Sequence, residues 1–197
     1  MLKTAFISNI FTLGLILPLK AQAESWTVDT AHSQVGFEVD HMMITTVKGN
    51  FGDFSGTLET NTKGKLIAMD GKVSIASVDT NDQKRDGHLQ SADFFDAETF
   101  PSMTFSSTKI KGSSEKGYTV QGDLTIRGVR KPVTLQLEPF KGPVVDGWGN
   151  TKVGTVATTT INRQDFGISW NSTLDAGGVV VGDEVDITID LQLIQAK

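Results

Sequence analysis

The chain has 197 residues, of which 23 are Asp or Glu and 18 are Lys or Arg, and it contains no Cys. Without cysteine, neither disulfide bonds nor thiol chemistry contribute to its stability or its function. The excess of acidic residues argues against nucleic acid, and against an anionic membrane surface, as electrostatic partners.

Residues 1–23 have the pattern of a cleaved signal peptide. Lys3 precedes a mostly apolar run, residues 5–19, and Ala21-Gln22-Ala23 supplies the small residues that signal peptidase requires. The run is short for a membrane span, so an uncleaved anchor is the less favoured alternative. We expect a periplasmic mature chain, residues 24–197, which loses Lys3 and Lys20 and keeps 16 basic against 23 acidic residues, a net charge of −7. Its length suits a single domain.

Alternation of apolar and polar residues, which is typical of β-strands, dominates the mature chain. The clearest case is residues 185–193, where Val, Ile and Leu occupy every second position. Arg127-Gly128-Val129 predicts a tight turn, and Arg163 with Asp165 predicts a charged pair at a strand corner. The other segments with a strand pattern are 33–40, 49–59, 72–78, 102–111, 118–126, 133–137 and 151–161.

Two segments remain for helix, residues 42–47 and residues 82–95. In the second, Lys84 and Arg85 are costly to bury and should face water. The apolar residues that follow, Leu89, Phe94 and Phe95, should not. This segment therefore predicts a plug, polar above and apolar below, that lies across the end of a β structure.

About eight long, two-faced strands form either a sandwich or a closed barrel. Closure would remove the strand edges that a sheet otherwise exposes. With the apolar faces turned inward, an eight-stranded barrel has room for packed side chains or for one slim ligand. The predicted fold class is all-β, with one or two short helices capping an end.

Five groups of residues in chain order resemble the YceI family of lipocalin-like, polyisoprenoid-binding proteins. They are Trp26-Thr27-Val28-Asp29 with His32-Ser33, Val47-Lys48-Gly49, the plug from Lys84-Arg85-Asp86 to Phe100-Pro101, Gly122 to Val133, and Asn162 to Ile168 followed by Val181 to Val185. The resemblance implies an antiparallel eight-stranded, lipocalin-like barrel over residues 24–197, with an isoprenoid lipid inside. It also implies an exported protein and a homodimer.

The predicted ligand-binding residues fall into an apolar and a polar group. His32, Lys84 and Arg85 are candidates for contacting a polar or anionic head group. Alternatively, His32 holds a strand entry by hydrogen bonds, and the two cations form a solvated helix face with Asp82 and Asp86. The residues expected to line the apolar interior are Phe37, Phe54, Phe105, Leu124, Ile126 and Ile189.

We expect a binding protein with no catalytic residue, no metal and no cofactor other than the lipid. No Gly-x-Ser-x-Gly elbow, phosphate-binding glycine loop or HExxH motif occurs in the chain. The predicted function is to bind, store or carry a polyprenyl phosphate or an isoprenoid quinone, with transient membrane contact. Two alternatives stay open: an enzyme that acts on a lipid head group at the barrel mouth, with His32 or His88 as base, and a barrel with a filled core that acts through protein partners.

Overall fold

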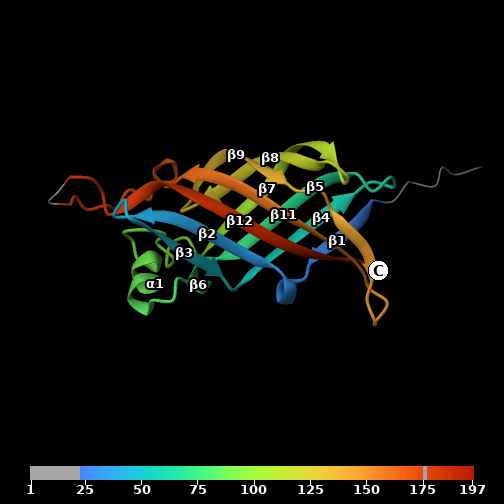
Figure 1. Ribbon diagram of the computed structural model, residues 1–197, viewed down its shortest axis with the longest axis horizontal. Coiled ribbons are helices and arrows are strands. Elements are labelled where there is room, and N and C mark those ends of the chain that lie inside the picture. The colour runs from blue at the N-terminus through green and yellow to red at the C-terminus, as the bar shows by residue number, and fades with distance from the viewer. Residues whose placement is uncertain (1–22, 175–176) are drawn as a thin grey trace, which may run out of the picture.

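The computed structural model describes residues 23–174 and 177–197, and these residues form one twelve-stranded antiparallel sheet with a single α-helix (Figure 1). The predicted signal peptide lies outside the described residues except for Ala23. The elements in chain order are β1 (Glu24–Val28), η1 (Thr30–His32), β2 (Gln34–His41), β3 (Thr45–Phe51), β4 (Phe54–Thr60), β5 (Leu66–Ser74), η2 (Ile75–Ser77), β6 (Val78–Asp79), α1 (Gln83–Gln90), β7 (Ser102–Ser113), β8 (Gly117–Ile126), β9 (Val129–Leu137), β10 (Lys141–Val145), β11 (Thr151–Asn162), η3 (Arg163–Phe166) and β12 (Val181–Gln195).

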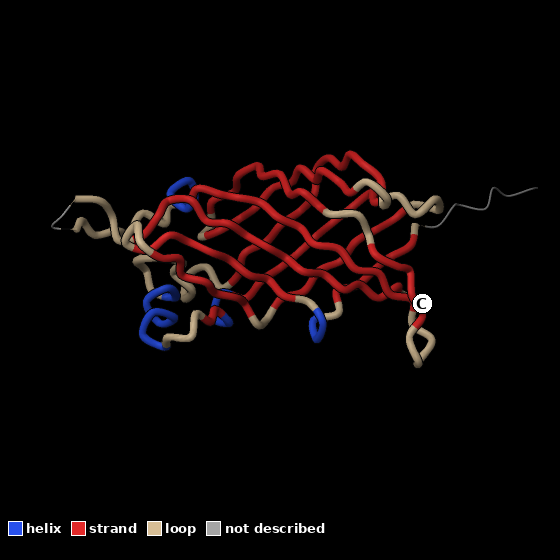
Figure 2. Tube along the Cα trace, viewed as in Figure 1, coloured by secondary structure: helices blue, strands red, loops and turns tan. Residues whose placement is uncertain are grey.

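The sheet closes into a barrel because β12 pairs with β11 along one edge and with β2 and then β1 along the other. At four positions in the wall, two consecutive strands follow one another end to end and count as one. These are β1 with β2, β3 with β4, β5 with β6, and β9 with β10. The described strands therefore make eight wall positions. This confirms the predicted eight-stranded antiparallel barrel, and Figure 2 shows that strands form nearly all of its wall.

The register of β12 explains which face is inside. Ile187 lies opposite Phe37 of β2, and Ile189 lies opposite Val35. Successive strand residues point to opposite faces, so these apolar side chains enter the barrel together, while Asp186 and Asp190 face outward. Burial of this shared apolar face is what makes the alternating pattern specify the register.

The predicted strand at residues 72–78 differs from the structure. β5 begins earlier, at Leu66, and ends at Ser74, where η2 bends the chain before β6. Ile75 in η2 is fully buried, which explains its place in the sequence pattern although it does not belong to a strand.

The helix predicted over residues 42–47 is wrong. Met42 and Met43 have φ angles of 53° and 61°, and the backbone N–H of Ile44 donates to the carbonyl of His41 at 3.2 Å. Two left-handed residues in succession are the geometry of a tight hairpin turn between paired strands. The β-branched residues Ile44 to Val47 favour the extended strand that follows.

The predicted plug is confirmed as α1 and the turns after it, at the end of the barrel opposite the C-terminus (Figure 1). Asp82 caps the helix by accepting hydrogen bonds from the backbone N–H groups of Lys84 and Arg85. Phe94 is buried beneath the helix, and Phe95 is half-buried beside Phe51. Among the described residues, no helix has both the length and the apolar character needed to cross a membrane.

Arg163 fixes a strand corner, as predicted, but its acidic partner is Asp183 and not Asp165. The guanidinium of Arg163 is buried and also donates to four backbone carbonyls, those of Ile168, Trp170, Val181 and Gly182. Burial lowers the pKa of this guanidinium, and the Asp183 carboxylate offsets part of that effect. The charged fork thus joins the segment after η3 to the start of β12.

Candidate functional site: the interior of the barrel

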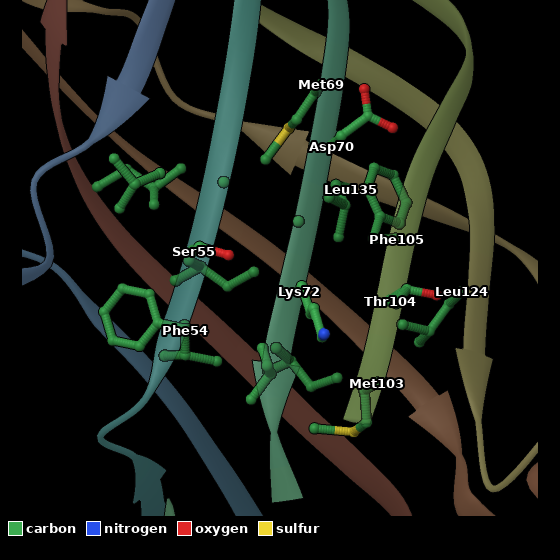
Figure 3. A pocket seen from close by; sticks show the side chains of 18 of the residues that line it. Phe54, Ser55, Met69, Asp70, Lys72, Met103, Thr104, Phe105, Leu124 and Leu135 are labelled. Carbon is green, nitrogen blue, oxygen red and sulfur yellow. The ribbon is translucent and has the colours of Figure 1, made fainter. Parts of the chain in front are cut away.

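The middle of the barrel holds a cavity of about 120 Å³ that strands surround (Figure 3). Met69, Met103, Phe105 and Leu124 lie around it in the figure. Its other apolar lining comes from Val28, Val35, Phe54, Leu58, Val73, Ile126, Val133, Leu135, Ile187, Ile189 and Leu191.

Most polar side chains of the wall strands lie outside this central cavity. Asp70 and Lys72 are exposed, and the Asp70 carboxylate accepts a hydrogen bond from the Ser106 hydroxyl at 2.7 Å on the outer surface. They border the cavity because their strand passes beside it, and only the alternate residues of β5, Met69 and Val73, send side chains inward. The wall of the central cavity is therefore almost entirely apolar, although Thr159, which lies opposite Ile187, brings a hydroxyl to its inner face.

A second cavity of about 120 Å³ lies between the central cavity and the plug. Leu89, Phe94 and Phe95 form its roof. It shares four wall residues with the central cavity, so the two are neighbours along the barrel axis; these are Val35, Met103, Ile126 and Ile187.

A third and larger cavity, of about 370 Å³, occupies the opposite end of the barrel. Leu58 belongs to both this cavity and the central one. The polar atoms of its aromatic walls are satisfied within the protein: Trp26 Nε1 donates to the Thr60 hydroxyl at 3.1 Å, and the Tyr118 hydroxyl accepts from the Leu66 backbone N–H at 3.2 Å. Three cavities thus follow one another from the plug to this open end.

Two glycines make room for aromatic rings inside the wall. The ring of Phe37 lies against Gly49, and the ring of Phe105 lies against Gly122, so closely that a Cβ atom at either glycine would overlap the ring. Neither glycine has a left-handed φ. Their role is to leave space, which lets a large ring lie along the wall beside the cavity.

The structure brings the six predicted apolar residues together in two groups. Phe54, Phe105, Leu124, Ile126 and Ile189 all line the central cavity, and Ile126 also reaches the cavity below the plug. Phe37 lines the cavity below the plug. The strand register places these residues side by side on the inner face of the barrel.

His32 lies in η1 and lines none of the three cavities along the barrel axis. Its Nδ1 is 3.0 Å from Asp29 Oδ2, and its side chain is 62% exposed. Burial alone would raise the pKa of Asp29, but hydrogen bonds from Gln192, Lys152 and His32 hold that pKa below its usual range. This polar cluster ties the bend between β1 and β2 to β11 and β12, which is the hydrogen-bonding role weighed for His32 above.

Lys84 and Arg85 lie on α1, and neither lines the cavity below the plug. Lys84 is exposed. Arg85 is half-buried, and its guanidinium donates to the hydroxyl and the carbonyl of Thr80, each at 2.7 Å. Asp86 accepts from the same Thr80, at its backbone N–H and its hydroxyl. Arg85 therefore holds the start of the plug in place, and a head-group role for these two cations stays a prediction.

His88 has a packing role within the plug. Its ring lies edge-on to Phe94 and to Trp170, with a centroid distance of 4.9 Å in each case. Nε2 is 3.0 Å from Asp93 Oδ2. The described residues contain no group of three His, Cys, Asp or Glu side chains placed to hold a metal ion.

A family model described as the YceI-like domain matches residues 26–193, almost the whole barrel. The chain belongs to the YceI-like family. A UPF0312 protein of Vibrio parahaemolyticus is 37% identical over 173 residues, which cover 85% of this chain and 89% of that protein.

Solved structures of similar proteins have the same fold. The YCEI protein of Campylobacter jejuni is 33% identical and superposes with a TM-score of 0.68 over 86% of this chain and 97% of its own. A polyisoprenoid binding domain from Saccharophagus degradans superposes with a TM-score of 0.61 over 87% of this chain and 98% of its own, at 14% identity. At 14% identity, this superposition shows that the two proteins share a fold.

Sequence reasoning missed several wall residues of this YceI-like barrel, although the signal was present. Val35 alternates with Phe37 on β2, Ile187 alternates with Ile189 on β12, and Met103 alternates with Phe105 on β7. Each missed residue lies two positions from a predicted one and therefore on the same face. Extending every predicted residue by two positions along its strand would have found them.

Proposed function

We propose that this protein binds a long isoprenoid lipid inside its barrel, as a carrier or store of a polyprenyl phosphate or an isoprenoid quinone. The observation that carries the proposal is the series of three cavities along the barrel axis, with a central section whose wall is almost entirely apolar. Membership of the YceI-like family and the likeness to a polyisoprenoid binding domain support it. The mechanism is burial of the tail, which needs no reacting group.

Energetics favour the tail over the head group as the main source of affinity. A tail of about 40 carbons, at roughly 0.8 kcal/mol per methylene, gains ~30 kcal/mol in gross transfer from water. Observed affinities do not exceed roughly 20 kcal/mol, so ordering the flexible tail must offset a large part of that gain. Shortening the tail should therefore weaken binding more than changing the head group.

The cavities must widen to accept such a tail. An apolar cavity of about 150 Å³ holds one benzene molecule, so the central cavity, at about 120 Å³, has room for about one isoprene unit. Met69 and Met103 stand in its wall. Methionine side chains are unbranched and change rotamer at low cost, so these two residues are the ones we expect to move aside.

The first experiment is extraction of the purified protein with organic solvent, followed by mass spectrometry of the extract. Phe105→Asp and Leu124→Asp each place a carboxylate against the tail, at a cost of several kcal/mol unless it protonates. Thr104→Asp is the matched control for Phe105→Asp, because it puts a carboxylate on the same strand, β7, but on the outer face of the barrel.

We expect both interior variants to lose bound lipid per folded molecule, with circular dichroism as the folding control, and the Thr104 variant to keep it. Normal lipid content in both interior variants would show that the tail does not run through the central cavity. A protein-partner role for a filled barrel would then be the better explanation.

Family membership points to a binding protein rather than an enzyme. The enzymatic alternative needs a base at the head group, and His32 and His88 were its candidates. Incubation of the protein with a polyprenyl diphosphate, with inorganic phosphate as the readout, tests it. Phosphate release that is lost in His88→Gln would support catalysis.

The location and the assembly state complete the proposal. We propose that a signal peptide, residues 1–23, directs the chain to the periplasm and is removed before Glu24. N-terminal sequencing of the exported protein tests this, and a sequence that began at Met1 would contradict it. We also propose a homodimer, to be checked by sedimentation velocity, and transient contact with a membrane, where such lipids reside.

A further inference from the structure

The turn between β10 and β11 projects beyond the open end of the barrel, beside the C-terminus (Figure 1). Its tip carries three exposed apolar side chains: Val144 is 62% exposed, Val145 is 71% exposed and Trp148 is 83% exposed. Successive strand residues point to opposite faces, so Val144 and Val145 show that both faces of the hairpin are uncovered. A hairpin that merely extended the barrel wall would have buried one face.

The Asp146 carboxylate holds the tip of this hairpin in a fixed shape. It accepts hydrogen bonds from the backbone N–H groups of Trp148 and Asn150, both at 2.9 Å, and from the Asn150 side chain at 3.1 Å. Lys152 Nζ lies 3.4 Å from the same carboxylate. The backbone that carries Trp148 is thus an ordered turn, and the indole is exposed at its tip.

The hairpin is continuous with the cavity at this end of the barrel. Phe140, Gly142, Pro143, Thr151 and Val153, which belong to or adjoin β10 and β11, line the cavity of about 370 Å³ at this end. One segment of chain therefore provides both the wall of the mouth and the apolar tip beyond it. At the opposite end, the plug closes the barrel with Phe94 and Phe95.

Charge is divided between the two ends. The open mouth carries four exposed lysines: Lys63 and Lys65 in the turn between β4 and β5, Lys116 in the turn between β7 and β8, and Lys141 on β10. Exposed acidic residues lie there too: Glu24 and Glu115 line the cavity, and Glu138 lies between β9 and β10. The Asp146 carboxylate is paired with Lys152. The plug segment, residues 82–98, carries five carboxylates against Lys84 and Arg85. The open end is thus less acidic than the plug end.

We propose that the β10–β11 hairpin docks the open mouth of the barrel on an anionic lipid bilayer, with Trp148 and Val145 inserted at the interface and the lysines of the neighbouring turns over the lipid phosphates. Tryptophan is enriched at membrane interfaces because its ring is apolar and its N–H is polar. Lysines near an anionic surface add electrostatic attraction. The inference rests on the proposed function in that it gives a bilayer lipid a route into the barrel.

Tryptophan fluorescence reports this docking in the exported protein. The chain has three tryptophans; Trp26 is buried, Trp170 is half-buried and Trp148 is exposed. Vesicles of phosphatidylcholine with phosphatidylglycerol should shift the emission to shorter wavelength and carry the protein with them on flotation. Vesicles of pure phosphatidylcholine should do so less, and Trp148→Phe should abolish the shift while most flotation remains.

Two sets of variants distinguish the contribution of apolar insertion into the bilayer from that of electrostatic attraction to anionic lipids. Trp148→Ser with Val145→Ser should weaken partition into the mixed vesicles about tenfold or more, because two buried apolar side chains are lost. Lys63→Gln and Lys65→Gln should each weaken it about fivefold, and only on the anionic vesicles. Ile44→Ser is the matched control, because Ile44 is also 83% exposed but lies at the plug end, and it should change nothing.

Binding of a polyprenyl phosphate supplied from detergent micelles separates this inference from the proposed function. The Trp148 and Val145 variant should bind that lipid normally and should take it up more slowly from vesicles. Failure of every variant and of the wild type to bind micellar lipid would count against the proposed function, whereas absence of flotation by a lipid-binding wild type would overturn the docking. Loss of a dimer in the variant, with no vesicle binding by the wild type, would assign the hairpin to a second copy of the chain and overturn it as well.

Discussion

Replacing Arg163 by Met should cost this protein several kcal/mol of folding free energy, because the guanidinium satisfies a group of backbone carbonyls at the plug end. Arg163 is 4% exposed and donates to the carbonyls of Ile168 at 2.8 Å, Trp170 at 2.9 Å and Gly182 at 2.8 Å. Methionine keeps an apolar chain of similar length in that space, so the substitution removes the donors with little loss of packing.

The magnitude follows from the partners left behind. The carbonyl of Val181 keeps a hydrogen bond from the Asn171 side chain at 2.7 Å, so it is not orphaned. The bond to Ile168 is fully buried, and those to Trp170 and Gly182 are partly buried. A buried acceptor without a partner costs about 1–3 kcal/mol, and removal of one member of a buried charged network costs about 3–5 kcal/mol. We therefore expect a loss of about 3–5 kcal/mol for Arg163→Met.

Urea unfolding followed by circular dichroism measures this loss, provided that the slope with urea is unchanged between variants. Arg163→Lys should lose less, since an ammonium still reaches some of the carbonyls. Asp183→Asn should lose less than about 1 kcal/mol, because the Asp183 carboxylate is 47% exposed. A loss below about 1 kcal/mol for Arg163→Met, or an equal loss for Asp183→Asn, would refute the carbonyl argument.

Three further predictions concern the plug, the wall and the hairpin. Phe94→Ala should lose about 3–5 kcal/mol in urea unfolding because Phe94 is 6% exposed, whereas exposed Lys84→Ala should change stability by at most about 0.5 kcal/mol. Gly122→Ala should lower the free energy of unfolding by about 1–3 kcal/mol, since its Cβ would overlap the Phe105 ring and lie 2.6 Å from a backbone oxygen. Gly71→Ala is the control, because its Cβ would meet nothing nearer than 3.9 Å, and it should be tolerated. Equal losses of stability in the two variants would contradict this prediction. Hydrogen bonds from Asn150, chiefly from its backbone, lower the pKa of Asp146 to about 2 from 3.8, so the stability it contributes is present above pH 3.8 and is lost as the pH falls toward 2. Asp146→Asn should flatten the fall in the urea midpoint between pH 4 and pH 2, and an unchanged fall would show that the Asp146 carboxylate does not contribute.

The local alternation of apolar and polar residues predicted most strands of this barrel and several residues that line its central cavity. Alternation on β12 put Ile187 and Ile189 on one face, and a shared apolar face admits only one register in a closed sheet. Phe54, Phe105 and Leu124 could be chosen as wall residues for the same reason, because side-chain direction in a strand depends only on the parity of the position. The helix over residues 42–47 was wrongly predicted for the opposite reason: six residues are too few for a helical period to be told from a turn and the strand after it.

The sequence did not predict which partners the charged side chains contact. Arg85 and Thr80 are close in the chain, but only the folded plug shows that the guanidinium donates to Thr80 and does not line the cavity. Arg163 lies twenty residues from Asp183, and Asp165 was the nearer acid, so proximity in sequence selected the wrong partner. Ion pairs depend on the distance between charged atoms in space, and the sequence carries no direct record of that distance.

The sequence by itself determined the class of fold, the apolar character of the interior and the acidic balance of the chain, because each follows from residue type and spacing alone. Only the tertiary structure decided how those charges are distributed. The net charge of −7 argued against an anionic membrane surface. Closure of the barrel nevertheless brings Lys63, Lys65 and Lys116 from two separate turns, and Lys141 from β10, to the open end, and it brings the plug carboxylates to the other end. A field at a surface is set by the charges within about a Debye length of it, roughly 10 Å, and which charges those are is a property of the fold.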